Sequence, residues 1–231
     1  MGLCCSNQRT HTPEFSLKRK TCVNKTYIEI VQGDIAYDSV DIIVNSTNCW
    51  LTMCGSASIL RHGGISIQRE CNDHLHKKLL KERKRTDILR RKNSSISSLK
   101  SHSNDVSHKG LKIGDVIRTN PGHLSCQHLF HAVGPIYADG KQGETDLLLK
   151  TIHNILTKAV KMNSRSISLP AISCGIFNFP REQCAEIMLK AIIEHLEETT
   201  STLQVIRVIS QDTPTILYFE KEFDKIFMTK V

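Results

Sequence analysis

Residues 166–180 read Ser166-Ile-Ser-Leu-Pro-Ala-Ile-Ser-Cys-Gly-Ile-Phe-Asn-Phe-Pro180, and this stretch decides the fold class. Its first four residues predict a short buried strand, and the residues from 180 to about 198 predict a helix. The loop between them offers peptide N–H groups at the positive end of that helix, an arrangement that binds phosphate or diphosphate. Gly175 would let the backbone approach a ligand closely. Alone, the pattern is weak evidence, because many such loops carry one glycine for turn geometry.

Strands and helices alternate on both sides of this loop. Strands are predicted at 27–32, 41–45, 115–119, 128–133, 166–169 and 203–210, and helices at 56–62, from 66 past 80, from 145, at 180–198 and at 213–227. This order predicts an α/β domain around a largely parallel sheet. In such sheets ligands bind in the loops at the carboxyl ends of the strands, so the residues there form the candidate site.

The composition is that of a soluble globular protein, with 39% hydrophobic and 23% charged residues. The 231 residues suit one domain of ordinary size, and no apolar run approaches the roughly 18 residues of a membrane-spanning helix. The N-terminus lacks the apolar stretch of a secretory signal, so we expect the nine cysteines to be reduced thiols of an intracellular protein. The expected location is the cytoplasm, with the nucleus as an open alternative.

The net charge of +8 is concentrated in two segments. Twelve Lys or Arg residues and three acids lie between Lys77 and Lys112, and residues 1–25 hold five basic residues and one acid. The rest of the chain is mildly acidic, which argues against a basic groove built into the fold.

Composition also predicts the organisation of the chain. We expect a flexible arm at 1–25, a domain at 26–227 and a short tail at 228–231. A basic, serine-rich insertion at about 83–110 is predicted to interrupt the domain as an exposed, disordered loop. Two interpretations of the insertion stay open: a solvated loop, or a contact with nucleic acid, another polyanion or anionic lipid.

The sequence begins Met1-Gly2-Leu3-Cys4-Cys5-Ser6, which matches the pattern for N-myristoylation of Gly2. Cys4 and Cys5 are candidate palmitoylation sites, and residues 18–20 add a basic patch. Because a second acyl chain or a basic segment turns marginal binding into stable anchoring, the pattern predicts a membrane surface as one partner. The alternative is that Met1 is not the true start, or that the paired cysteines are incidental.

Four sequence blocks stand at predicted strand ends: Gly33-Asp34-Ile35, Val44-Asn45-Ser46-Thr47-Asn48, Ala132-Val133-Gly134-Pro135 and Pro170-Ala171-Ile172-Ser173-Cys174-Gly175-Ile176-Phe177. In this combination the chain resembles the macrodomain family, over about residues 26–227 apart from the insertion. It looks most similar to the macrodomains of the antiviral, BAL-type group of poly(ADP-ribose) polymerases. The resemblance implies a three-layer α/β/α fold with a mixed, mostly parallel sheet, and ADP-ribose as the ligand.

The resemblance also implies roles for single residues. Asp34 would accept a hydrogen bond from the adenine amine, Asn48 would bond to the distal ribose, and Phe177 would pack against that ribose. The amides of residues 173–176 would hold the diphosphate. The implied binding set is Asp34, Ile35, Asn45, Asn48, Gly55, Ser56, Val133, Ser173, Cys174, Gly175, Ile176, Phe177, Gln211 and Asp212. Ordinary alternatives are a cap for Asp34, an Asx turn for Asn48 and a core position for Phe177.

The sequence departs from the family pattern in the loop after Asn48. Members with strong hydrolase activity carry a run of glycines and then an acid there, whereas this chain has Thr52-Met53-Cys54-Gly55-Ser56. Serine cannot act as the carboxylate that activates water near neutral pH. Met53 and Cys54 are expected to crowd the distal ribose, and Gln211 stands near where an aromatic side chain often stacks on adenine.

We therefore predict an ADP-ribose-binding module that reads free or protein-linked ADP-ribose, is a monomer and needs no cofactor. One alternative is a hydrolase that removes mono-ADP-ribose from proteins, with Asn48 as the candidate catalytic residue. Another is a degenerate pocket in an interaction scaffold. No metal site is predicted, because Cys126, His128 and His131 match no compact zinc pattern. Cys174 is expected to be a small loop residue, since no His–Asp relay can be assigned to it.

Overall fold

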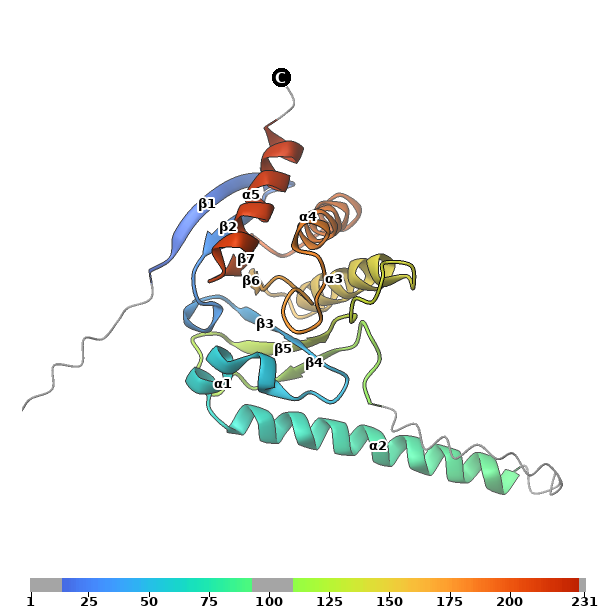
Figure 1. The fold of residues 1–231 in the computed structure, drawn as a ribbon. Helices are drawn as coiled ribbons and strands as arrows, with labels where there is room; N and C mark the ends of the chain where they lie inside the picture. The colour runs from blue at the N-terminus through green and yellow to red at the C-terminus, as the bar shows by residue number, and fades with distance from the viewer. Residues whose placement is uncertain (1–13, 93–109, 229–231) are drawn as a thin grey trace, which may run out of the picture.

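The computed structural model describes residues 14–92 and 110–228, apart from the side chains of Cys54 and of residues 89–92 (Figure 1). Seven strands form one sheet in the order β1-β2-β7-β6-β3-β5-β4. In that order they are Ser16–Val23, Thr26–Gln32, Val205–Ser210, Ser166–Leu169, Ile42–Thr47, His128–Val133 and Val116–Thr119. The five central strands, β2, β7, β6, β3 and β5, are parallel, and the edge strands β1 and β4 are antiparallel to their neighbours. The predicted mixed, mostly parallel sheet is confirmed.

Helices cover both faces of the sheet and complete three layers (Figure 1). One face carries α3 (Glu144–Lys161), α4 (Arg181–Glu198) and α5 (Thr213–Phe227). The other carries the short turns η1 (Ile35–Tyr37) and η2 (Met53–Gly55), the helix α1 (Ala57–Gly63) and the start of α2 (Ser66–Lys92). No helix of the described residues is both long and apolar enough to span a bilayer.

Alternation along the strands supplies an apolar surface to each layer. Val44 of β3 and Phe130 of β5 are fully buried in the larger cluster, on the face that α3, α4 and α5 cover. Ile43 of β3 and Leu129 of β5 are fully buried in the smaller cluster, which α1 and α2 cover. Because successive side chains of a strand point to opposite faces, both layers are anchored by the same short strands.

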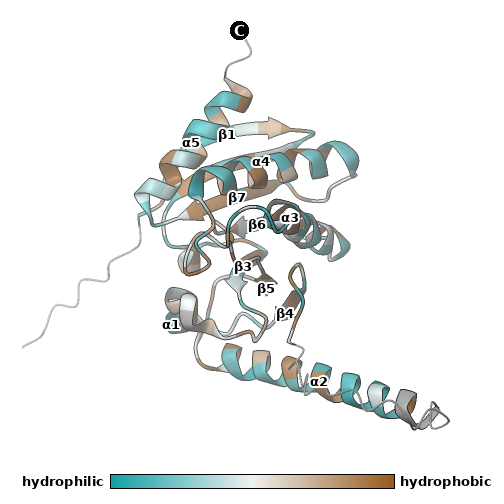
Figure 2. Ribbon diagram, turned by 45° about the vertical axis from the view of Figure 1, so that its right-hand side comes forward, coloured by the Kyte–Doolittle hydropathy of each residue, from teal (hydrophilic) through white to brown (hydrophobic). Residues whose placement is uncertain are grey.

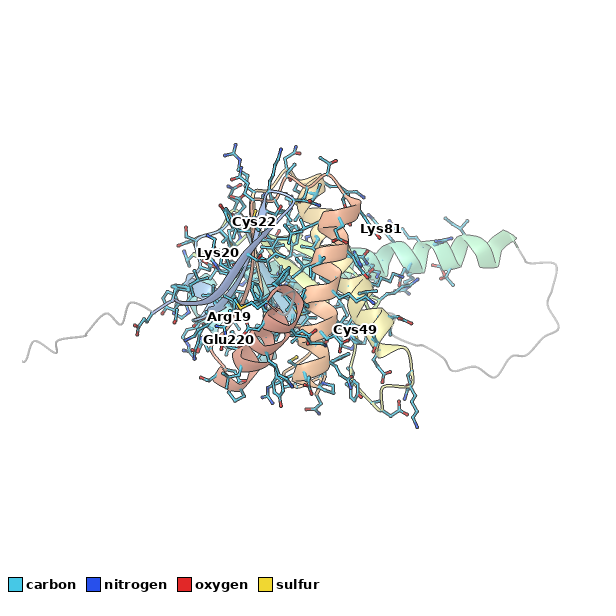
Figure 3. All side chains as sticks on the ribbon, turned by 90° about the horizontal axis from the view of Figure 1, so that it is seen from above. Arg19, Lys20, Cys22, Cys49, Lys81 and Glu220 are labelled. Carbon is cyan, nitrogen blue, oxygen red and sulfur yellow. The ribbon has the colours of Figure 1, made fainter. Side chains whose placement is uncertain are left out.

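The expected flexible arm at 1–25 is wrong from Ser16 onward, where the chain forms β1. This strand pairs with β2 along its whole length. Its Arg19 guanidinium reaches α5, where it contacts Asp224 at 2.6 and 2.8 Å and Glu220 at 2.8 Å. Figure 3 shows Arg19 and Glu220 beside each other where β1 passes α5. A polar, basic sequence is therefore held as an edge strand by ion pairs rather than by apolar burial. Residues 1–13 lie outside the described part.

The expected loop from residue 83 is also wrong at its start, because α2 continues to Lys92. Residues 83–92 contain no glycine or proline and are rich in Arg and Lys, which favour helix. The serine-rich part of the predicted insertion, at 93–109, lies outside the described residues.

Candidate functional site

A cleft of about 450 Å³ opens at the carboxyl ends of the parallel strands. Its walls are the loops after β2, β3, β6 and β7, together with the start of α1. The volume lies within the roughly 300–1,000 Å³ of small-molecule sites. Every residue of the predicted binding set except Val133 lines the cleft. Val133, predicted as a binding residue, does not line the cleft, because its side chain is buried in the smaller apolar cluster.

The loop after β6 is held in an unusual backbone conformation. Ser173 has φ 66° and Asn178 has φ 54°, both in the left-handed region. Gly134 makes the close approach possible, because a Cβ there would lie 2.2 Å from the Ser173 hydroxyl oxygen. The Ser173 hydroxyl is buried without a hydrogen-bond partner among the described residues. Strain of this kind persists where the surrounding structure fixes it, and it is common at ligand sites.

This loop presents unused backbone donors to the cleft. Within the described chain, the amides of Gly175, Ile176 and Phe177 make no hydrogen bond, whereas those of Cys174 and Asn178 bond to Ala171 and Gly175. A Cβ added at Gly175 would meet nothing within 4 Å, so open space lies beside it. Consecutive free amides beside the N-terminus of α4 form an anion-binding concavity.

The two phenylalanines of this loop have different roles. Phe179 is buried in the larger cluster, with its ring centroid 5.1 Å from that of Tyr137. Phe177 is half-buried and lines the cleft. Phe177 is therefore not a core residue, contrary to the alternative, and it is available to a ligand, whereas Phe179 belongs to the core.

Arg181 is a cleft residue that the sequence did not single out. It begins α4, and its Nε lies 3.0 Å from the Thr215 hydroxyl and 3.2 Å from a carboxylate oxygen of Asp212. A cation at this position adds positive charge beside the free amides. Its position directly after Pro180, in the first turn of the predicted helix, is the signal that could have identified it.

Asp34 acts as a cap and faces the cleft. Its carboxylate accepts hydrogen bonds from the Ala36 amide at 3.0 Å and from the Ser58 hydroxyl. The cap interpretation is therefore correct, and it is compatible with the position of Asp34 in the cleft wall. Ser58, which was not predicted, joins the start of α1 to the loop after β2.

A buried hydrogen-bond chain fixes the loop after β3. The Ser56 hydroxyl donates to the Asn45 side-chain oxygen, and the Asn45 amide nitrogen lies 3.1 Å from Nδ1 of His131. Nε2 of His131 lies 2.9 Å from the Thr119 hydroxyl, which in turn donates to the Asn120 carbonyl. Asn45 thus uses both ends of its side chain inside the protein and supports the cleft from below. Asn45 was predicted to bind the ligand, and the structure places it in the wall of the cleft.

His131 is neutral at this position. Burial lowers the pKa of its imidazole to about 4. Both ring nitrogens are engaged, with Nδ1 accepting from Asn45 and Nε2–H donating to Thr119, so neither is available to a metal. The described residues contain no cluster of three or more potential metal ligands.

The Asn48 side chain is turned toward its own loop. Its oxygen accepts from the amides of Trp50 at 2.9 Å and Thr52 at 3.2 Å, and its nitrogen donates to the Thr52 hydroxyl. The Asx-turn alternative is therefore correct in this conformation, although Asn48 still lines the cleft.

Met53 does not crowd the cleft, contrary to expectation. Its side chain is buried in the smaller apolar cluster, and its backbone amide donates a hydrogen bond to the side-chain oxygen of Gln68 in α2 at 3.0 Å. The Cys54 side chain lies outside the described part. Met53 is thus held toward α2 and away from the cleft, while other residues of its loop still line the cleft.

The fourth wall is the loop after β7. Asp212 caps α5 through the Thr215 amide at 3.1 Å and the Thr215 hydroxyl at 2.5 Å, and hydrogen bonding from Thr215 lowers the pKa of this carboxyl. Gln211 is exposed at the cleft edge. Asp212 therefore contributes structure, and Gln211 is the side chain of this loop that is open to a ligand.

Relatives in sequence agree with this architecture. Residues 87–188 match the Macro domain family. A Macro domain-containing protein encoded in the gbd 3' region of Cupriavidus necator is 30% identical over 84% of this chain and 96% of its own length. The O-acetyl-ADP-ribose deacetylase 1 of Pantoea vagans is 31% identical over 80% of this chain and 91% of its own length. A longer relative from Thermotoga maritima is 34% identical over 85% of this chain, which spans 28% of that protein.

Solved structures share the fold. The Oceanobacillus iheyensis macrodomain with ADP aligns with a TM-score of 0.72 over 94% of this chain and 100% of that chain, at 24% identity. The Trypanosoma brucei macrodomain in complex with ADP-ribose aligns with a TM-score of 0.62 over 84% and 68%, at 22% identity. The three-layer α/β/α prediction is confirmed. Together with the curated relatives, these similarities show that the chain belongs to the macro domain family.

Proposed function

We propose that this protein binds ADP-ribose, free or attached to other proteins, in the cleft at the strand ends. The observation that carries the proposal is the pairing of two chemistries in one cavity. The free amides of Gly175, Ile176 and Phe177 suit a diphosphate, and the Asp34 carboxylate suits an adenine amine. The ligands named for the solved macrodomains, ADP and ADP-ribose, have both groups.

Calorimetric titration of the full chain with ADP-ribose tests this function. Asp34→Ala should weaken binding by about 10-fold or more, because a hydrogen bond to a charged group contributes roughly 1.5–3 kcal/mol. The matched control is Asp73→Ala, which removes an exposed carboxylate of α2 outside the cleft. Binding heat that is unchanged in Asp34→Ala would contradict the assignment of the cleft.

Hydrolysis is the second candidate, and the names of two relatives favour it. The proteins of Pantoea vagans and Salmonella newport are called O-acetyl-ADP-ribose deacetylases. In this chain the carboxylates that line the cleft are Asp34 and Asp212, and both already accept hydrogen bonds from their own loops. The Ser56 hydroxyl donates a hydrogen bond to the Asn45 side-chain oxygen, and a serine is no carboxylate base. We therefore infer a reader rather than an enzyme. Release of ADP-ribose from a modified protein at stoichiometric enzyme would overturn this inference.

We further propose that acylation of Gly2, Cys4 or Cys5 holds the protein at a cytoplasmic membrane surface. The Gly2-to-Ser6 pattern and the basic residues 18–20 support this proposal. Gly2→Ala should move the full chain from the membrane fraction to the soluble fraction of cells, and unchanged partitioning would refute anchoring. We also propose that the protein belongs to the BAL-type subgroup, on the basis of the four sequence blocks, and that it is a monomer.

A further inference from the structure

The second half of α2 stands away from the body of the protein (Figures 1 and 3). Its first turns are anchored by Ile67 and Cys71, which are buried in the smaller apolar cluster. From Arg83 to Ile88 every side chain is exposed. Figure 2 shows hydrophilic residues along this part of α2, with apolar ones between them. Among the residues that the structure describes, nothing covers the side chains from Arg83 to Ile88.

The projecting half carries a concentrated positive charge. Residues 77–92 include nine Lys or Arg and two acids. Lys77, Lys81, Lys84 and Arg85 recur at helical spacing and share one face, here called the basic ridge. At about 100° per residue, Glu82 and Asp87 lie about 100° or more from the centre of that face. The four cations of the ridge form no ion pair within the described chain, whereas the neighbouring Lys78 pairs with Asp115 at 3.1 Å.

This arrangement is unfavourable for the isolated protein. Like charges at i and i+4, such as Lys77 with Lys81 and Lys81 with Arg85, destabilise a helix. Most helices in proteins are stabilised by packing of an apolar face, which this half lacks. A partner of opposite charge would relieve the repulsion and cover the helix.

We infer that the basic ridge of α2 binds the phosphate backbone of a double-stranded nucleic acid. The segment 77–92 is about 23 Å long at 1.5 Å per residue, which matches roughly seven phosphates of one strand at 3.4 Å each. A helix exposed on all sides has a diameter of about 10–12 Å, and the major groove of B-form DNA is about 12 Å wide.

Other polyanions fit α2 less well. Single-stranded nucleic acid and ADP-ribose chains expose bases that need aromatic platforms, and α2 contains no Phe, Tyr or Trp. An interfacial membrane helix needs a broad apolar face, and the exposed apolar residues among the described side chains of α2, from Lys77 to Ile88, are Leu80 and Ile88. A duplex keeps its bases stacked inside and requires only cations along a phosphate backbone. This inference is independent of the ADP-ribose cleft.

Fluorescence anisotropy of the full chain with a labelled 24-base-pair DNA duplex tests the inference. If each of the four ridge cations neutralises one phosphate, affinity should fall on the order of 100-fold between 50 and 200 mM salt. The variant K77Q/K81Q/K84Q/R85Q should lose most of this affinity and flatten the salt slope by about 3–4. The matched control is K141Q/K150Q/K161Q/R165Q, which removes the same charge from exposed positions elsewhere.

Circular dichroism establishes that each variant keeps its helix content, and the smaller pair K81Q/R85Q serves if the fourfold variant unfolds. A loss confined to the ridge variants would support the inference. Equal loss in the control, or no loss in the ridge variants, would overturn it. It would also be overturned by tighter binding of a single strand, an ADP-ribose polymer or anionic phosphatidylserine vesicles than of the duplex.

Discussion

At the scale of single residues, His131 explains how a polar loop is held over an apolar sheet. Its ring bridges Asn45 on β3 and Thr119 on β4, and Asn45 in turn holds Ser56 at the cleft. A protonated imidazole would donate from Nδ1 and could no longer accept the Asn45 amide. The orientation of the Asn45 side chain therefore depends on a neutral histidine.

The lowered pKa of His131 predicts a pH-dependent stability. The unfolded imidazole titrates near 6.5 and the folded one near 4, so the unfolded state binds the additional proton between these values. This contribution to the free energy of unfolding is fully present above pH 6.5 and is lost as the pH falls toward 4. Between pH 7 and pH 5 the loss should be roughly 2 kcal/mol.

Urea unfolding of the wild type and of His131→Gln at pH 7 and pH 5 measures this effect. Glutamine cannot titrate and keeps an oxygen that can accept from Asn45, so the variant should lose about 2 kcal/mol less than the wild type. His76→Gln, at an exposed position of α2, is the control and should behave like the wild type. Equal pH dependence in His131→Gln and wild type would show that the imidazole does not govern this stability.

At the scale of elements, periodic and apolar segments were predictable and polar ones were not. The strands 128–133 and 166–169 and the helix 213–227 have the predicted bounds, because their side chains are patterned for burial. The strand β1 lacks such a pattern. It is fixed by pairing with β2 and by Arg19, whose partners Glu220 and Asp224 are about two hundred residues away in sequence. No local rule identifies such partners.

The cleft, too, was predictable only in part. Its loops were predictable because parallel strands bring their carboxyl ends to one edge of the sheet, and the sequence blocks stand at those ends. Arg181 and Ser58 were missed, and Met53 and Val133 were misplaced, because their surroundings are set by other elements. Met53, for example, is drawn into the smaller cluster by Gln68 of α2.

At the scale of the whole molecule, the two helical layers on either side of the sheet supply different parts of the cleft. The layer of α3, α4 and α5 buries the larger cluster and carries the loop with the free amides at the start of α4. The thinner layer on the other face holds the loops near Asp34 and Ser56, and from it α2 projects. The cleft lies where the two layers meet the strand ends, so both must be in place for one ligand to contact Asp34 and Gly175.

The position of the diphosphate in a crystal of the full chain grown with ADP-ribose tests this account most directly. We predict phosphate oxygens within about 2.7–3.2 Å of the amide nitrogens of Gly175, Ile176 and Phe177, with the adenine beside Asp34. A diphosphate bound away from these amides, or an adenine on a different wall of the protein, would contradict it.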